Sequence, residues 1–223
     1  MTIISAEVPA SGRARRASGL RSEATILQAA ERVFAERGFK GASMSEIAAA
    51  AHMPKPNLHY YFGTKEALYR AVLTDILETW LGEADAFVPD GDPAQALGSY
   101  VRAKMRWSRE RPHASRVFAN EVLHGALFIG PYLSDDLRRR VEQKGKVIEG
   151  WIRGGRMARV DPRALFFMLW AMTQTWADFA VQVHAVLGVA DLSEAAYDAI
   201  TEEVVAFALR GCGLDADGRP PAT

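Results

Sequence analysis

The chain has 223 residues, of which 49% are hydrophobic and 24% charged, and these proportions exclude a disordered chain, a collagen and a coiled-coil rod. Its single cysteine, Cys212, excludes an intramolecular disulfide and a cysteine-based zinc site. The longest apolar run, residues 164–172, is about half the length that a membrane span requires, and the first ten residues lack the apolar stretch of a signal peptide. We therefore expect a globular protein of the reducing cytoplasm, with no membrane partner.

Charge is unevenly divided along the chain, although the net charge is zero. Residues 1–65 contain six arginines and three lysines against five glutamates, and the rest of the chain carries the opposite excess. Four arginines gather in a segment rich in glycine, serine and alanine: Arg13, Arg15, Arg16 and Arg21. Because basic arms often bind phosphates, residues 1–21 are predicted to form a disordered arm for DNA, with an ordinary solvated tail as the alternative.

The first predicted helix covers residues 22–37. Apolar side chains recur there at helical spacing: Ile26, Ala29, Ala30, Val33 and Phe34. Gly38 follows the last of them and can take the left-handed conformation that ends a helix.

Two shorter helices are predicted next. Ser43 and Glu46 have the spacing of a capping box, which predicts a second helix over residues 47–51. Pro56 suits the first turn of a third helix that ends at Phe62. Such a pair can place its second helix in the major groove of DNA, while a surface amphipathic helix is the alternative.

The rest of the chain is also predicted to be helical. A long helix over residues 65–86 leads into a larger body, where Asp92 and Asp161 each stand before a proline suited to a first helical turn. Asp191 and Glu194 resemble another capping box. Without two-residue alternation or repeats, about nine helices and an all-α fold are expected. The expected domains are a head (22–68), a body (69–212) and a flexible tail (213–223).

The third predicted helix carries residue types that suit DNA. Lysine can donate to guanine, asparagine can pair with adenine, and tyrosine hydroxyls commonly contact phosphate. The run Ser45-x-Ile47-Ala48-x-x-Ala51 and Leu58-His59-Tyr60-Tyr61-Phe62-x-x-Lys65-Glu66-x-Leu68 resembles the DNA-binding head of the TetR family of transcriptional regulators. The resemblance implies binding to double-stranded operator DNA, with phosphate contacts from Ser45, Lys65 and Tyr60 and base contacts from Lys55, Pro56, Asn57 and His59. His52 stands where the family usually has glycine.

A candidate ligand site lies on the apolar segment 161–187. Trp170, Gln174 and Asp178 fall within an arc of about 80° and span about 12 Å of an ideal helix, so they could line one cavity. Gln174 can donate and accept together, which matches the edge of a lactam or a nucleobase. A helix end or a partner subunit that satisfies the buried Gln174 and Asp178 is the alternative.

A narrower resemblance supports the ligand site. It is carried by Glu78-Thr79-Trp80-Leu81, Arg111-Pro112-x-Ala114-Ser115-Arg116 and Phe167-Met168-x-Trp170-Ala171-x-Thr173-Gln174. These runs are similar to the pyrimidine-utilisation regulators within the TetR family. The resemblance implies a uracil or thymine effector, with Trp80, Trp170 and Gln174 in its pocket.

Further apolar faces on two helices predict a homodimer. A C2 dimer would bury both faces and place two heads along one side of DNA, although other helices of the same chain could cover them instead. The predicted interface residues are Leu169, Met172, Trp176, Phe179, Tyr197 and Val204.

No enzyme motif is evident, since the chain has no nucleophile elbow, phosphate-binding loop or dinucleotide fingerprint. Glu121 and His124 form half of a di-iron motif, so a helical metalloenzyme is the alternative from another class. A hydrogen-bonded pair explains these two residues more simply. We expect a regulator without cofactor or catalysis, which represses or activates when a small molecule changes the spacing of its heads.

Overall fold

The structure is a computed structural model that describes residues 10–214, with side chains from residue 21 onward. All regular elements within this range are helical, which confirms the all-α prediction. None of the described helices combines the length and apolarity needed to cross a membrane. The chain divides into two compact units, Met1–Thr74 and Asp75–Thr223. This division falls a few residues beyond the predicted boundary at residue 68.

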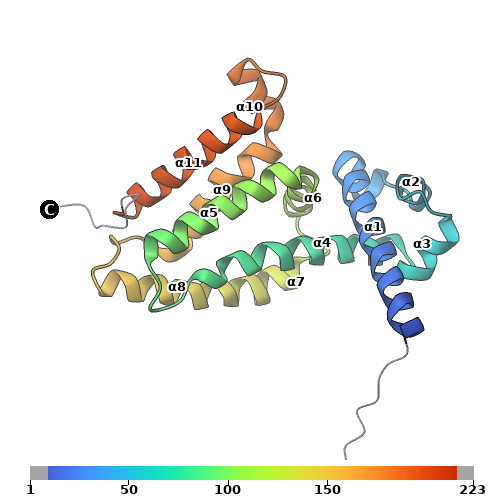
Figure 1. The fold of residues 1–223 in the computed structure, drawn as a ribbon, viewed down its shortest axis with the longest axis horizontal. Coiled ribbons are helices and arrows are strands. Elements are labelled where there is room, and N and C mark those ends of the chain that lie inside the picture. The colour runs from blue at the N-terminus through green and yellow to red at the C-terminus, as the bar shows by residue number, and fades with distance from the viewer. Residues whose placement is uncertain (1–9, 215–223) are drawn as a thin grey trace, which may run out of the picture. The chain divides into compact units, whose positions relative to one another are not determined.

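The elements are labelled in Figure 1. Those that begin in the first unit are α1 (Ala10–Gly41), α2 (Met44–Ala50), α3 (Lys55–Phe62) and α4 (Lys65–Gly82). The second unit adds a 3-10 turn η1 (Glu83–Ala86), α5 (Pro93–Glu110), α6 (Pro112–Leu123), α7 (Gly130–Tyr132), a π-helical turn η2 (Leu133–Leu137), α8 (Arg138–Arg153), α9 (Pro162–Asp178), α10 (Ala180–Leu187) and α11 (Glu194–Gly211).

Helix α1 begins earlier than the sequence predicted. It starts at Ala10, so residues 10–21 are helical and the prediction of a disordered arm is wrong for them; residues 1–9 lie outside the described range. Alanine and arginine are strong helix formers, and they extend a helix whose nucleus is already fixed by packing. The predicted break at Gly38 is confirmed by its φ of 65°.

Helices α2 and α3 form the predicted helix-turn-helix. The Ser43 N–H donates to Glu46 Oε2 (3.0 Å) and the Glu46 N–H donates to Ser43 Oγ (3.2 Å), so the predicted capping box is present. His52 in the turn has a φ of 53°, the left-handed conformation that glycine would supply. Pro56 lies in the first turn of α3, as predicted.

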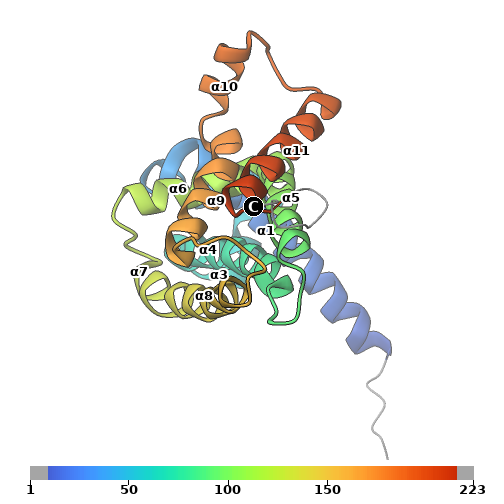
Figure 2. The same cartoon turned by 90° about the vertical axis from the view of Figure 1, so that its left-hand side faces the viewer.

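Helix α5 is central to the second unit. It packs against α9 and α11, while α6 and α8 also contact α9. Buried side chains from α5, α8, α9 and α11 form one core together with Phe87, which follows η1, and Trp151 and Phe87 meet there edge to face. Figures 1 and 2 show α10 projecting away from this bundle at the end of α9.

Several boundaries in the second unit test the sequence predictions. The Asp92 and Asp161 side chains cap α5 and α9, as predicted. For α11 the prediction was wrong, because Ser193 caps it by accepting from the Ala196 N–H (3.2 Å), whereas Asp191 accepts from the N–H of the residue after it.

Two further segments differ from expectation. The helix expected over residues 161–187 is divided into α9 and α10 at Phe179, whose backbone leaves the helical conformation (φ −112°, ψ 28°). Residues 213 and 214 do not belong to a flexible tail, because Leu214 is buried in the core. The remainder of that predicted tail, residues 215–223, lies outside the described range.

Candidate functional site

Helix α3 presents a polar face to solvent. Leu58 is fully buried and Phe62 is half-buried, so both lie on the packed side of the helix. The residues predicted to contact DNA from this helix are all exposed: Lys55, Pro56, Asn57, His59 and Tyr60. Tyr60 is 85% exposed, which is unusual for a tyrosine and leaves its ring and hydroxyl available to a partner.

A hydrogen bond that the sequence did not reveal orients His59. Its Nδ1 lies 2.7 Å from the carbonyl oxygen of Gly63. Because a carbonyl oxygen can only accept, Nδ1 is the donor, and a neutral ring then presents Nε2 as an acceptor. The bond keeps the imidazole in a defined position on the exposed face of α3, as a base-reading side chain requires.

Lys65 has a structural contact in addition to its predicted contact with phosphate. Its Nζ donates to the carbonyl oxygen of Ala42 (2.9 Å) and lies 4.7 Å from the centre of the Phe39 ring. An ammonium has three hydrogens, so two remain for a phosphate. Lys65 therefore ties the start of α4 to the segment before α2.

The other predicted phosphate contacts lie in the first two helices. Ser45 is exposed in the first turn of α2, and Arg21 is exposed on α1. The remaining arginines of the predicted arm have side chains outside the described residues: Arg13, Arg15 and Arg16.

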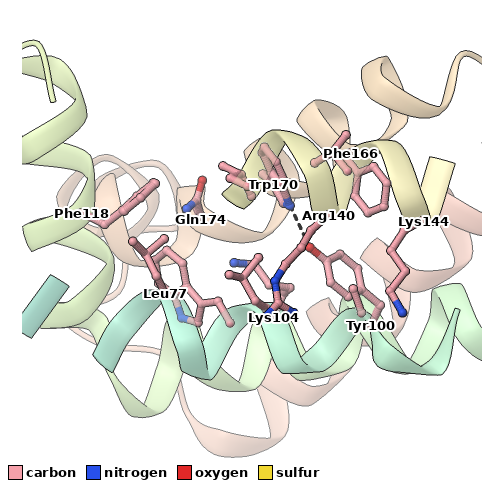
Figure 3. Close-up of a pocket in the computed structure, with 14 residues that line it drawn as sticks. Leu77, Tyr100, Lys104, Phe118, Arg140, Lys144, Phe166, Trp170 and Gln174 are labelled. Atoms are coloured by element: carbon pink, nitrogen blue, oxygen red, sulfur yellow. Dashed lines mark hydrogen bonds between the residues drawn. The ribbon is translucent and has the colours of Figure 1, made fainter. Parts of the chain in front are cut away.

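The second unit contains a cavity of about 670 Å³, counted with its mouth (Figure 3). Its lining comes from five helices and two turns: Leu77, Trp80, Leu81, Ala84, Tyr100, Lys104, Phe118, Leu137, Arg140, Val141, Lys144, Phe166, Trp170 and Gln174. Trp80, Trp170 and Gln174, which were predicted to share a pocket, therefore do line the same cavity.

Trp170 and Gln174 differ in whether their polar groups already have hydrogen-bond partners. The Trp170 indole N–H donates to the Tyr100 hydroxyl (2.7 Å), so Trp170 offers a ligand its ring rather than its N–H. Burial raises the pKa of Tyr100 to about 12, which keeps that hydroxyl neutral. The Gln174 amide forms no hydrogen bond with any described residue and is available to a ligand.

Asp178 does not line the cavity, contrary to the prediction. It is the last residue of α9, and its surroundings are Ser115, Lys104 and Arg116. Burial raises the pKa of Asp178, and these three neighbours partly oppose the increase. The ideal helical arc places Asp178 near Gln174, but α6 packs against α9 and its Ser115 and Arg116 surround the carboxyl group instead.

Three basic residues of the cavity were missed by the sequence analysis: Lys104, Arg140 and Lys144. One signal was available for Lys104. It lies four residues after Tyr100 and three after Val101 on the apolar face of α5, where a lysine is unusual. Arg140 and Lys144 stand in a charged run that resembles an ordinary solvated face, so the sequence offered no comparable signal for them.

The predicted dimer interface is only partly exposed. The prediction that Leu169 and Tyr197 lie in the dimer interface was wrong. Both side chains are buried in the core of their own chain, where α5 covers α9 and α11. Met172, Trp176 and Val204 are half-buried, and Phe179 is 59% exposed. Phe207, which belongs to the apolar stripe that the sequence indicates on the last helix, is exposed on α11. Met168 on α9 and Val181 on α10 are exposed apolar residues that the sequence analysis did not predict.

Glu121 and His124 do not form a metal site. The Glu121 carboxylate is buried and accepts from the Phe128 N–H (2.6 Å), which closes the loop after α6. His124 is exposed and bonds through Nδ1 to the Asn120 carbonyl oxygen (2.7 Å). The two side chains have separate partners, and the described residues contain no cluster of three or more potential metal ligands. The metalloenzyme alternative is therefore not supported.

Comparison with protein families identifies both units. Residues 26–72 match the family described as "Bacterial regulatory proteins, tetR family", and residues 73–215 match "YcdC-like protein, C-terminal region". The chain is 41% identical over 204 residues to the HTH-type transcriptional regulator RutR of Escherichia coli K12, covering 92% of this chain and 96% of RutR. It is also 34% identical to the HTH-type transcriptional repressor NicS of Pseudomonas putida, over 48% of this chain and 51% of NicS.

Solved structures share the same fold. A TetR-like transcriptional regulator from Rhodococcus sp. RHA1 is 25% identical with a TM-score of 0.61, covering 85% of this chain and 94% of that one. AibR in complex with isovaleryl coenzyme A and operator DNA is 22% identical with a TM-score of 0.63, covering 83% and 97%. Together with the helix-turn-helix geometry, these matches show that the chain belongs to the TetR family and is a DNA-binding transcriptional regulator.

Proposed function

We propose that this chain is a homodimeric regulator of the cytoplasm, without catalytic activity, whose affinity for operator DNA is changed by a pyrimidine such as uracil or thymine. The observation that carries the proposal is the cavity, which is lined by the rings of Trp80 and Trp170 and by the unbonded amide of Gln174. Figure 3 shows Trp170 and Gln174 in this lining. The exposed polar face of α3 supplies the surface that contacts DNA.

The cavity chemistry favours a small planar ring with both donors and acceptors. Aromatic faces stack on flat rings, and a primary amide pairs with an N–H beside a C=O, as in the imide edge of uracil. The resemblance to pyrimidine-utilisation regulators supports the same ligand class. AibR, which shares the fold, has been solved with a small molecule and operator DNA together.

A second copy of the chain is the expected partner of the exposed apolar side chains at the ends of α9 and α11. Phe179 and Phe207 are 59% and 64% exposed, and such side chains are normally covered when they gather at an interface. A C2 dimer would also supply the two heads that a palindromic operator requires.

Helix α4 is the proposed link between ligand and DNA. It is a continuous helix that carries Lys65 at its start and Trp80 near its end. Displacement of Trp80 by a ligand would move the helix that begins at the predicted phosphate contact. By linkage, a ligand that weakens DNA binding must bind the DNA complex more weakly by the same factor, commonly about 5 to 150-fold.

The direct test is a fluorescence-anisotropy titration of the purified protein on its own upstream intergenic DNA, at two salt concentrations, with and without excess uracil. We expect salt-dependent binding that uracil weakens. Binding that ignores uracil and thymine would contradict the pyrimidine effector, and a lack of sequence preference at both salt concentrations would contradict the regulator itself.

Replacement of Gln174 with leucine is expected to weaken uracil binding by about 10 to 100-fold, because the polar edge of the ligand loses its partner in a partly buried site. Operator affinity without ligand should not change. Isothermal titration calorimetry measures the first quantity and anisotropy the second. Gln143→Leu, an exposed position on α8, is the matched control and should bind uracil like the wild type. Unchanged uracil binding by Gln174→Leu would contradict the assignment of the cavity.

A further inference from the structure

The charge of the cavity lining is one-sided. Among its fourteen residues are Lys104, Arg140 and Lys144, and none of the fourteen is an aspartate or a glutamate. A neutral pyrimidine needs no such excess of positive charge. The proposed function therefore does not explain why the lining is basic.

Lys104 is the most informative of the three cations. Its side chain is only 4% exposed, and its Nζ lies 4.0 Å from the centre of the Trp80 ring. Within the described part of the chain the ammonium makes no hydrogen bond and no ion pair. Figure 3 shows Lys104 and Gln174 reaching the cavity from two different helices. The Trp80 ring gives the ammonium a cation–π contact but no hydrogen-bond acceptor, so its three N–H donors remain available to a ligand in the cavity.

The neighbouring carboxylates do not complete it. Glu83 accepts from the Trp107 indole N–H (2.7 Å) and pairs with Arg106 (3.3 Å). Asp178 is near enough to act electrostatically on Lys104, but it lies outside the cavity lining and forms no ion pair with the ammonium. Burial lowers the pKa of Lys104 to about 8, against the opposing charges of Asp178 and Glu83. The amine is therefore still mostly protonated at pH 7.

The other two basic residues of the lining, Lys144 and Arg140, differ in whether they have an ion-pair partner. Lys144 lies 3.5 Å from Asp85 and 3.5 Å from the carbonyl oxygen of Phe87, so it already has partners. Arg140 is exposed at the cavity and has no ion-pair partner among the described residues. An anionic group in the cavity could thus pair directly with the largely buried ammonium of Lys104, and the exposed guanidinium of Arg140 would lie at the mouth of the cavity.

We propose that the effector is an anionic pyrimidine, whose negative group pairs with Lys104 while its imide edge meets Gln174. This inference rests on the proposed pyrimidine-responsive function and narrows its ligand class. Pairing would give the ammonium a hydrogen-bond acceptor that the described residues do not supply, and a charge-assisted hydrogen bond in a desolvated site is stronger than a neutral one. Uracil would occupy the same ring position with lower affinity.

Calorimetric titration of the full chain with three pyrimidines tests the inference. The probes are orotate, which is uracil with a 6-carboxylate, its neutral methyl ester, and uracil. We expect orotate to bind at least tenfold more tightly than either neutral compound. Lys104→Met, which keeps the volume without the charge, should remove the preference for orotate over its methyl ester. Lys146→Met, an exposed position on α8, is the matched control and should keep the preference.

Each remaining result separates this inference from the proposed function. Uracil binding equal to or tighter than orotate binding by the wild type overturns the anionic class and leaves the pyrimidine effector standing; this comparison needs no variant to fold. Nicotinate, a planar anion without an imide edge, binding as tightly as orotate would overturn the pyrimidine assignment and the inference that rests on it. No binding of any pyrimidine would overturn both.

Discussion

Operator affinity is expected to fall by roughly 30-fold to 10⁴-fold when Lys55 and Asn57 are both replaced with alanine. Both side chains are exposed on α3, beside the oriented imidazole of His59. A good contact between a side chain and a base edge contributes about 1–3 kcal/mol of discrimination, and the double variant removes two of them. The affinity for unrelated DNA should change much less, because phosphate contacts dominate it.

Fluorescence anisotropy with operator and with scrambled DNA of the same length measures this change. Uracil binding, followed by calorimetry, should be unaffected because the cavity residues all belong to the second unit. Lys146→Ala removes a lysine from α8 and controls for the loss of positive charge. If the double variant keeps the wild-type preference for the operator, α3 is not the helix that reads the sequence.

Trp151→Ala is expected to lower the free energy of unfolding of the second unit by about 3–5 kcal/mol. Trp151 is completely buried and packs edge to face on Phe87, with ring centres 5.8 Å apart. Its indole N–H donates to the Pro89 carbonyl oxygen (3.1 Å), but Arg156 also donates to that oxygen. The loss therefore comes mainly from the cavity left in the core, and it is a large part of a typical total stability of about 5–15 kcal/mol.

Urea unfolding followed by circular dichroism, at one fixed protein concentration, measures the effect of Trp151→Ala. Trp151→Phe is the matched control, because it keeps an aromatic ring beside Phe87 and should lose roughly 1–2 kcal/mol. A variant with alanine at position 151 that unfolds within 1 kcal/mol of the wild type would show that this core repacks, contrary to the tight burial described above.

Predictions from the sequence succeeded where the determining contacts are local. Ser43 and Glu46 are three residues apart and cap α2 with no help from other helices. Gly38 ends the regular part of α1 because of its own backbone freedom. The exposed face of α3 followed from the burial of Leu58.

The early start of α1 shows the limit of such local reasoning. Its basic segment has no apolar period, yet residues 10–21 are helical. Helix propensity alone is a weak guide, because a segment joined to a packed helix avoids the cost of nucleation that an isolated peptide must bear.

The sequence by itself determined the all-α class, the helix-turn-helix and the three cavity residues Trp80, Trp170 and Gln174, because caps, helical periodicity and family motifs are visible along the chain. Only the tertiary structure decided which side chains share the cavity with them. Tyr100 and Trp170 are 70 residues apart yet share a hydrogen bond, and Lys104 enters the same space from α5. The packing of α5, α6 and α8 on α9 selects these neighbours and surrounds Asp178 instead of leaving it in the lining. Contacts of this kind depend on how the helices dock, which no local spacing records.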